Sequence, residues 1–357
     1  MLTHKENAVV YCEGAFNTPN GKTAHGLVRF TERYKICSVI DSTFKGSDSG
    51  MILDGRPNGI PIVQSFNEAL IAATKSGELI KYFIMGIAPD GGRIPEEALA
   101  PIVSAIKSRI SIVSGLHDFL AEDEYLLALA NSHNCELIDI RKPPARSELH
   151  FFSGKIEAVS CPKIAILGTD SAIGKRTTAW LLVHAFRAAG KKVEMIGTGQ
   201  TAWLQGARYS IVLDSLVNDF VSGEIEHVIH TAWKQEDPEF LILEGQGSLL
   251  NPAYPGGYEL IAAGRPDYLV LQHAPRRMEY DGFPGYPLHD LKRQLEAVRI
   301  ISGKEVVAIT MNHEGMEKEE IKQACLQITD DTGLPAFDVL EYGAEGLMEV
   351  LLTKTIK

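Results

Sequence analysis

Residues Lys163–Phe186, with the sequence KIAILGTDSAIGKRTTAWLLVHAF, carry the strongest structural signal in this chain of 357 residues. The apolar run Lys163–Leu167 predicts a buried strand, and a loop that begins at Gly168 follows it. The pair Gly174 and Lys175 then starts an amphipathic helix. A strand, a glycine-containing loop and a helix in this order predict a phosphate-binding loop, because the loop N–H groups and the positive helix N-terminus attract an anion.

The whole loop and the first turn of the helix are therefore candidates for binding a phosphate-bearing cofactor. Lys175 supplies a mobile positive charge for the outer phosphates, which also makes it a candidate catalytic residue. The cofactor-binding candidates are Gly168, Thr169, Asp170, Ser171, Ala172, Ile173, Gly174, Lys175, Arg176, Thr177 and Thr178.

Two features of this loop depart from the commonest form. Five residues separate its glycines, where the usual pattern has four. Arg176 occupies the position where Ser or Thr normally reaches Mg²⁺. Two alternatives follow: Thr177 or Thr178 takes over as the metal ligand, or Arg176 contacts phosphate directly.

The rest of the chain predicts an α/β protein of two domains. Short apolar runs alternate with longer amphipathic ones, a pattern typical of βαβ units and parallel sheet. The segment Arg141–Pro162 holds three prolines and little periodicity, so we place the domain boundary there, between residues 150 and 151. We expect a Rossmann-like parallel sheet in residues 1–150 and a P-loop NTPase-like parallel sheet in residues 151–357.

Composition narrows the possible partners. The formal net charge of −11 argues against binding to nucleic-acid backbones and anionic membranes, which attract clustered Lys and Arg. The five cysteines form no CxxC pair, which argues against a disulfide framework or a thiolate zinc site. We find no signal peptide and no apolar run long enough to span a membrane. We therefore expect a cytoplasmic homo-oligomer that acts on a small molecule.

A second signal follows the predicted strand Phe240–Leu243, which ends in Glu244 and continues as GQGS. In P-loop proteins a carboxylate at such a strand end helps to hold Mg²⁺. Glu244 is therefore a candidate catalytic residue and, together with Thr177, a candidate metal ligand. Gly245 and Gln246 come next and are candidates for contact with substrate. The simpler alternative is a strand followed by a glycine-rich turn.

A third signal is the sequence GTGQT, which follows the predicted strand Val193–Ile196. Ligands of α/β sheets lie beyond the carboxyl ends of the strands. Gln200 and Thr201 would therefore face the same crevice as Lys175, and we name both as candidates for substrate binding. A simple turn is the alternative.

A fourth signal follows the predicted strand Tyr268–Gln272. His273 ends this strand and is a candidate base, although a structural role is the alternative. Arg276 and Arg277 lie in the loop beyond it, and two guanidinium groups suit a carboxylate or a phosphate. They are candidates for substrate binding, with a solvated arginine pair as the alternative.

The first half of the chain lacks the dinucleotide-binding fingerprint GxGxxG, since its early glycines stand at positions 14, 21 and 26. Asp41 ends a predicted strand, where a ribose-binding acid often lies, but a Rossmann-like domain that never binds NAD explains it equally well. His117 follows the predicted strand Ile110–Ser114 and is a further candidate for substrate binding.

Several of these segments together resemble the bacterial and archaeal family known as domain of unknown function 1611. The resemblance rests on GLHDFL, IDIRKPP, GTDSAIGKRTTA, GTGQTAW, DSLVNDFVSG, EGQGSLLNPAY and RPDYLVLQHAPRR, and it runs nearly the whole chain. It implies an N-terminal Rossmann-like domain and a C-terminal P-loop domain. Some family members are described as D-glutamate N-acetyltransferases that use acetyl-CoA. The phosphate loop and EGQG are also similar to dethiobiotin synthetase, which has Thr where this chain has Arg176.

Three functions are consistent with these observations. In the first, implied by the family, the P-loop grips acetyl-CoA, Arg276 or Arg277 holds an acidic amino acid, and His273, His117 or Glu244 deprotonates its ammonium group. In the second, ATP and Mg²⁺ drive an amide-forming ligase, with Lys175 and Glu244 stabilising phosphoryl transfer. In the third, the chain is a non-enzymatic nucleotide-binding switch. The cofactor is therefore acetyl-CoA or ATP, the latter with Mg²⁺.

Overall fold

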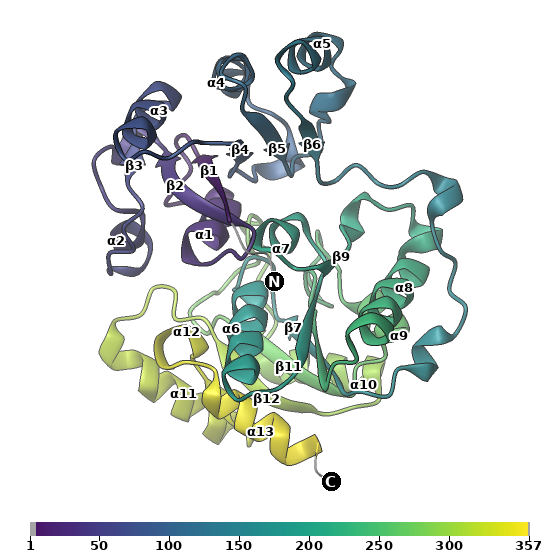
Figure 1. Cartoon of the computed structure of the whole chain (residues 1–357). Helices are drawn as coiled ribbons and strands as arrows, with labels where there is room; N and C mark the ends of the chain where they lie inside the picture. Colours follow the sequence, from purple (N-terminus) through teal and green to yellow (C-terminus); the bar gives the residue numbers. More distant parts are fainter. Residues whose placement is uncertain (1–4, 356–357) are drawn as a thin grey trace. The chain divides into compact units, whose positions relative to one another are not determined.

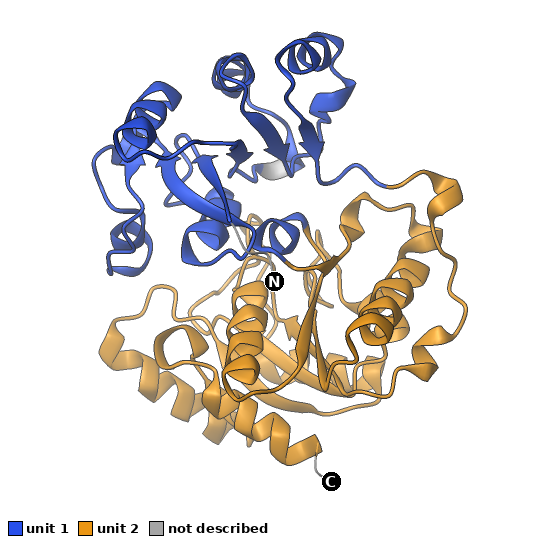
Figure 2. Ribbon diagram, viewed as in Figure 1, with its two compact units in different colours: residues 1–143, 200–206 blue, residues 144–199, 207–357 orange. Residues whose placement is uncertain are grey.

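A computed structural model describes residues 5–355, apart from the side chain of Asp90. The chain divides into two compact units (Figure 2). Unit 1 comprises Met1–Pro143 and Gln200–Gly206, and unit 2 comprises Pro144–Gly199 and Ala207–Lys357. The change of unit after Pro143 lies in the proline-containing segment, and the short stretch Gln200–Gly206 returns to unit 1 from the middle of unit 2.

Unit 1 is built on a parallel sheet of six strands in the order β3-β2-β1-β4-β5-β6 (Figure 1). This is the doubly wound order in which the chain reverses direction beside its first strand. The strands are β1 (Glu6–Tyr11), β2 (Tyr34–Ile40), β3 (Ile62–Val63), β4 (Tyr82–Met85), β5 (Ser111–Ser114) and β6 (Leu137–Asp139). The helices are α1 (Lys22–Arg29), α2 (Ser49–Asp54), α3 (Phe66–Lys75), α4 (Glu96–Lys107), α5 (Glu124–His133) and α7 (Gln200–Gln205).

Unit 2 is built on a parallel sheet of seven strands in the order β13-β12-β11-β7-β10-β8-β9. The strands are β7 (Lys163–Gly168), β8 (Val193–Gly197), β9 (Tyr209–Ser210), β10 (Phe240–Glu244), β11 (Tyr268–His273), β12 (Val306–Met311) and β13 (Ala336–Phe337). The helices are α6 (Lys175–Ala188), α8 (Asn218–Glu236), α9 (Tyr258–Gly264), α10 (Leu291–Ser302), α11 (Lys318–Thr332), α12 (Val339–Tyr342) and α13 (Glu345–Thr355).

Helices cover both faces of the sheet in unit 2. Helix α9 packs against α8 and α10, while α6 packs against α12 and α13 (Figure 1). Strands β7 and β10 lie at the centre, and every residue of both is buried. Burial on both faces explains why their sequences are nearly continuous apolar runs rather than alternating patterns. The predicted fold class, α/β with a Rossmann-like and a P-loop parallel sheet, is confirmed.

Helix α7 was not expected from the sequence, which predicts a loop after the strand Val193–Ile196. In the structure this helix packs against α1 within unit 1. Gln205 Nε2 donates to the carbonyl oxygens of Gly26 and Phe30 at the end of α1 (2.8 and 3.0 Å). The Arg33 guanidinium lies 3.9 Å from the centre of the Trp203 ring. Contacts with distant residues therefore stabilise a helix that is too short to be marked by sequence periodicity.

Candidate phosphate-binding site

The loop between β7 and α6 has the geometry of an anion site. Strand β7 ends at Gly168 and α6 begins at Lys175. The residue that precedes the helix is Gly174, with a φ of +102°, a left-handed conformation that glycine adopts without strain. Because glycine has no side chain to cap the helix, no side-chain oxygen binds the N–H groups of its first turn. An uncapped helix N-terminus of this kind suits an anion.

Lys175 joins this loop to the one that follows β10. Its side chain is buried, and Nζ donates to Asp170 O (2.6 Å) and to Gly247 O (2.8 Å). The ammonium group therefore lies inside the phosphate loop, at the carboxyl ends of the neighbouring strands β7 and β10. A buried charge of this kind acts in a low-dielectric environment, where its attraction for a phosphate is strong.

Asp170 fixes the shape of the loop. Its side chain is fully buried. The carboxylate accepts hydrogen bonds from Asn251 Nδ2, Arg277 Nη1 and the N–H groups of Ser171 and Asp281, at 2.7 to 2.9 Å. These donors come from the loops after β7, β10 and β11. Asp170 therefore holds three loops together, and its own oxygens are already occupied by protein groups.

Arg277, predicted to bind substrate, lies inside the same network. Its Nε and Nη2 donate to the two carboxylate oxygens of Glu314 (2.7 and 2.8 Å), and Nη1 donates to Asp170 Oδ2 and Ser171 O (both 2.8 Å). Burial on its own would lower the pKa of Arg277, but the hydrogen bonds to Glu314 and Asp170 raise it overall. Arg276 is half exposed and donates to Gly315 O and to Glu320. In this structure both guanidinium groups bind protein oxygens.

Glu244 lies at the carboxyl end of β10, next to the phosphate-loop strand. It is buried, and it accepts a hydrogen bond from the N–H of Thr198 (2.8 Å). Burial raises the pKa of its carboxyl, and the positive charges of Arg176 and Lys175 oppose that shift. Thr198 Oγ1 in turn donates to Glu244 O (3.0 Å) and accepts from Gln246 Nε2 (2.7 Å). Glu244 and Gln246 are therefore oriented by one residue at the end of β8.

Gly245 is required by close packing. A Cβ at this position would lie 2.1 Å from Ile166 O, well inside contact distance. The chain after Glu244 therefore runs directly over the backbone of β7. Any side chain at position 245 would push this segment away from β7, which explains a glycine here without reference to a ligand.

The candidate Mg²⁺ ligands Thr177 and Glu244 have a positive charge beside them. Thr178 Oγ1 donates to Gln272 Oε1 (2.6 Å), which also accepts from Thr310 Oγ1, so this hydroxyl is engaged. Thr177 is half-buried in the first turn of α6. Arg176 places a positive charge where a hydroxyl ligand normally stands, and that charge acts on Glu244. Among the residues that the structure describes, no group of three or more His, Cys, Asp or Glu side chains could hold a metal ion.

The predicted histidines differ in environment. His273 Nδ1 lies 3.1 Å from Thr169 Oγ1 in the phosphate loop, and burial lowers the pKa of His273 to about 4. It is therefore neutral at pH 7. His117 belongs to unit 1, where its N–H donates to Gly92 O (2.7 Å).

Gln200 and Thr201 also belong to unit 1. Both are buried at the start of α7, and Thr201 Oγ1 lies 3.1 Å from Thr23 Oγ1. A Cβ added at Gly115, which follows β5, would lie 2.6 Å from the Gln200 side chain. Both candidates therefore pack against residues of unit 1.

Sequence reasoning missed one segment of the phosphate site, residues 312–314 after β12. Asn312 Nδ2 donates to Ile173 O in the phosphate loop (3.1 Å), and Glu314 binds Arg277. His313 lies between them. Three polar residues directly after a predicted strand are the same kind of signal that identified Glu244, so this segment could have been found from the sequence.

The corresponding edge of unit 1 is filled by its own residues. Asp41 is buried at the end of β2 and accepts hydrogen bonds from the N–H groups of Phe16 (3.0 Å) and Thr43 (2.9 Å). Phe16, in the loop after β1, is fully buried. Asp41 therefore holds a loop in place, which accounts for this acid without a ribose.

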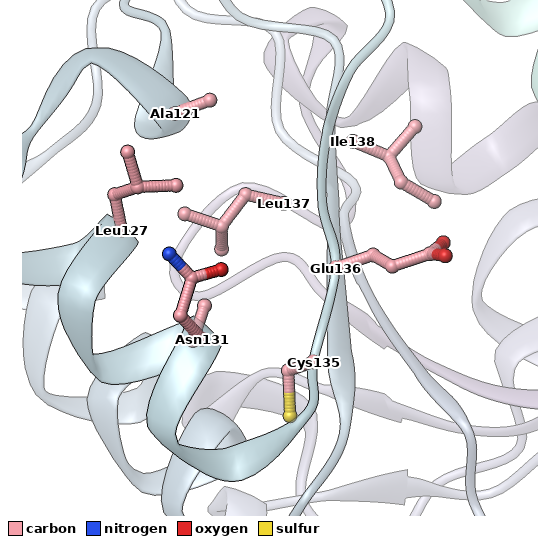
Figure 3. Close-up of a pocket in the computed structure, with 8 residues that line it drawn as sticks. Ala121, Leu127, Asn131, Cys135, Glu136, Leu137 and Ile138 are labelled. Carbon is pink, nitrogen blue, oxygen red and sulfur yellow. The ribbon is translucent and has the colours of Figure 1, made fainter.

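A pocket in unit 1 lies beside the edge strand β6 and helix α5 (Figure 3). Its lining includes Leu127, Asn131, Cys135 and Leu137. Burial raises the pKa of the Cys135 thiol, which makes it a poor nucleophile. We assign no chemistry to this pocket.

None of the helices in the described part of the chain is both long and apolar enough to cross a membrane.

Comparison with known proteins agrees with this architecture. Residues 150–348 match the family described as "Domain of unknown function (DUF1611_C) P-loop domain", and residues 42–143 match "Domain of unknown function (DUF1611_N) Rossmann-like domain". The chain belongs to the DUF1611 family. It is also similar to a solved structure of a DUF1611 family protein from Anabaena variabilis ATCC 29413, with a TM-score of 0.88 and 29% sequence identity, covering 98% of this chain and 100% of that one.

Two relatives in sequence carry the name D-glutamate N-acetyltransferase. The relative from a Pseudoalteromonas species is 30% identical over 299 residues, which is 82% of this chain and 87% of the relative. The relative from Tritonibacter scottomollicae is 30% identical over 277 residues, which is 76% of this chain and 81% of the relative. Relatives of this DUF1611 protein are thus named as transferases.

Proposed function

We propose that this DUF1611 protein transfers the acetyl group of acetyl-CoA to the amino group of an acidic amino acid, D-glutamate in the first instance. The observation that carries the proposal is the arginine at position 176. It replaces the hydroxyl that normally binds Mg²⁺ in a phosphate loop whose other departure from the common form is one extra residue between its glycines. A loop that holds a cofactor diphosphate without cleaving it has no need of that metal. The names of the two relatives support the same reaction.

The reaction removes two protons from the amino nitrogen, one to the CoA thiolate and one to solvent, and exchanges a C–S bond for a C–N bond. The ammonium group of the amino acid loses a proton, and the amine nitrogen attacks the thioester carbonyl carbon. The C–N bond forms, the C–S bond breaks, and CoA leaves as a thiolate that takes up a proton. The products are an N-acetyl amino acid and free CoA, with one proton released to solvent. Backbone N–H groups near the carbonyl would stabilise the transient oxyanion.

The residues of unit 2 have distinct proposed roles. Lys175 and the N–H groups of the loop hold the diphosphate, while His273 orients Thr169 within that loop. Glu244, held by Thr198, together with Gly245 and Gln246, lines the side where the amino acid enters. We propose that Arg277 acts indirectly, by fixing Asp170.

A second function is favoured by one specific feature. Glu244 ends the strand beside β7, which is where a Mg²⁺-binding carboxylate stands in P-loop enzymes that use ATP. An ATP-dependent amide-forming ligase is therefore the alternative, and in it Thr177 and Glu244 would hold Mg²⁺. The charge of Arg176 beside Glu244 counts against this arrangement.

Thiol release separates the two functions. The purified protein is mixed with acetyl-CoA and D-glutamate in the presence of EDTA, and free CoA and N-acetylglutamate are followed by a thiol reagent and mass spectrometry. L-glutamate and D-aspartate serve as acceptor controls. Metal-independent formation of both products in equal amounts supports the proposal. Turnover that requires ATP and Mg²⁺ and releases no thiol would refute it and establish the ligase.

A further inference from the structure

A histidine paired with a buried carboxylate stands at the carboxyl edge of the unit 2 sheet. His313 Nδ1 lies 2.6 Å from Asp338 Oδ2. The Asp338 side chain is fully buried, whereas the His313 side chain is 29% exposed. The two residues follow β12 and β13, which are neighbours in the sheet. The pair therefore lies where ligands of parallel sheets bind, with the His313 side chain partly exposed.

The residues on either side of His313 bind the phosphate loop. Asn312 Nδ2 donates to Ile173 O, and the Asn312 N–H donates to His273 O (2.8 Å). Glu314 accepts two hydrogen bonds from Arg277, which also donates to Asp170. A segment tied to the phosphate-loop network on both sides of one residue gives that residue a fixed position relative to the loop.

The hydrogen bond to Asp338 decides which nitrogen of His313 is available. An ionised carboxylate only accepts hydrogen bonds, so Nδ1 carries the hydrogen and Nε2 keeps its lone pair. Asp338 Oδ1 accepts from the Glu341 N–H (2.9 Å), which fixes the carboxylate at the start of α12. A histidine whose Nδ1 is held by a fixed carboxylate is the arrangement that enzymes use for a general base.

The predicted bases in unit 2 are less suited to this task. His273 is neutral, and with a pKa of about 4 its affinity for a proton is low. Glu244 is buried and already bonded to Thr198. From these contrasts we propose that His313 is the general base of the transfer reaction, with Asp338 as its positioning residue. This inference rests on the function proposed above.

The step attributed to His313 is balanced. Nε2 accepts a proton from the ammonium group of the amino acid, and the freed lone pair on nitrogen forms the bond to the thioester carbon. The C–S bond then breaks and its electron pair leaves with CoA. The nitrogen gives its second proton to the departing thiolate, and His313 releases the first proton to solvent. The positive charge on the imidazole during this cycle is stabilised by Asp338.

Other ionisable groups lie near the His313–Asp338 pair and would contribute to a measured pH dependence. Asp338 faces His313 from the start of α12, and Glu314 is next in the chain. On α11, Cys325 faces Asp338, and burial raises the pKa of its thiol, so it stays neutral. Lys318, at the start of α11, and Glu341, on α12, form an ion pair of 2.7 Å.

The chain offers a matched control. His150 Nδ1 also pairs with a carboxylate, Glu224 Oε1, at 2.9 Å. That pair joins the linker before β7 to helix α8, where the His150 ring stacks on His227. Unlike His313 and Asp338, neither His150 nor Glu224 lies directly after a strand. His150→Gln therefore removes the same kind of interaction from a different part of unit 2.

The test compares His313→Gln, Asp338→Asn and His150→Gln with the wild-type protein. At pH 7 we expect His313→Gln to lower kcat about 100-fold or more, the usual contribution of a general base, with KM for acetyl-CoA unchanged. The deficit shrinks as pH rises, because solvent then deprotonates the amine. Asp338→Asn, in which Asn still caps α12, gives an intermediate loss of kcat. His150→Gln keeps the wild-type rate.

Each contrary outcome has a clear meaning. If His313→Gln retains kcat within threefold of wild type, or loses the same factor at every pH, His313 is not the base. If that variant does not fold, a wild-type kcat for Asp338→Asn overturns the assignment instead. If the wild-type protein releases no CoA with D-glutamate, the proposed function itself fails, and the base with it.

Discussion

The two sheets of this protein share one architecture and differ at the edge where ligands bind. In unit 1, Asp41 and Phe16 fill the carboxyl ends of β1 and β2, and Asp41 binds backbone N–H groups. In unit 2, the chain after β7 forms a loop with Lys175 buried inside it, and no side chain caps the helix that follows. Parallel sheets with helices on both faces therefore do not by themselves imply nucleotide binding. The side chains at the strand ends decide it.

The largest expected effect on stability comes from replacing Arg277. In unit 2 the phosphate loop depends on a buried ion pair, whereas in unit 1 the matching loop depends on neutral N–H donors. Arg277→Met leaves Asp170 and Glu314 without their partner and is expected to lower the free energy of unfolding by about 3–5 kcal/mol. Thermal and denaturant unfolding would measure the loss.

Arg276→Met is the control for this prediction. Arg276 is the preceding residue, and its ion pair with Glu320 is half exposed. Solvent screens such a pair, so its removal should change stability far less. Equal effects of the two substitutions would show that the buried network does not stabilise the loop.

The second prediction concerns acid stability. Burial lowers the pKa of His273 from 6.5 to about 4. Between these values the unfolded chain binds a proton that the folded chain does not, so stability is present above pH 6.5 and is lost as pH falls towards 4. His273→Asn should remove this part of the acid sensitivity, of order 1–3 kcal/mol.

Unfolding midpoints measured from pH 8 to pH 4 would test this difference. The matched change in unit 1 is His117→Asn, at a strand end of the other sheet. If both variants follow the wild-type pH profile, His273 is protonated equally in the folded and unfolded chains.

The smallest effect is expected at Asp41. Asp41→Asn replaces one acceptor oxygen by an amide N–H₂, so the N–H of either Phe16 or Thr43 loses its acceptor. The cost to folding should be about 1–2 kcal/mol. Affinity for acetyl-CoA should not change, and calorimetry would measure it. Weaker binding in this variant would contradict the view that the edge of unit 1 serves only packing.

Much of unit 2 could be predicted because its elements depend on residues that lie close together in the sequence. The order of strand, glycine loop, lysine and helix at Lys163–Thr178 is a local pattern, and the structure places the strand and helix there. The end of β10 at Glu244 was found in the same way. Both predictions depend on residues that are close in sequence, where hydrophobic periodicity and turn chemistry are most informative.

Long-range pairing could not be predicted. Arg277 has the sequence context of a ligand-binding loop, and only the structure brings it to Asp170 and Glu314, which lie 107 and 37 positions away. The same holds for α7, whose contacts with α1 join residues about 180 positions apart. The pairing of His313 with Asp338 is a further case, because Asp338 lies 25 positions further on, after a two-residue strand that has little periodicity.

The central claim is that unit 2 binds a phosphate-bearing cofactor through its loop without Mg²⁺. Calorimetric titration of acetyl-CoA in EDTA tests it most directly, with wild-type protein, Lys175→Ala and the surface control Lys191→Ala. We predict that Lys175→Ala weakens binding roughly 10- to 150-fold, the value of a charged hydrogen bond to phosphate, while Lys191→Ala binds like wild type. Equal affinity in all three proteins, or binding that appears only with Mg²⁺, would contradict the claim.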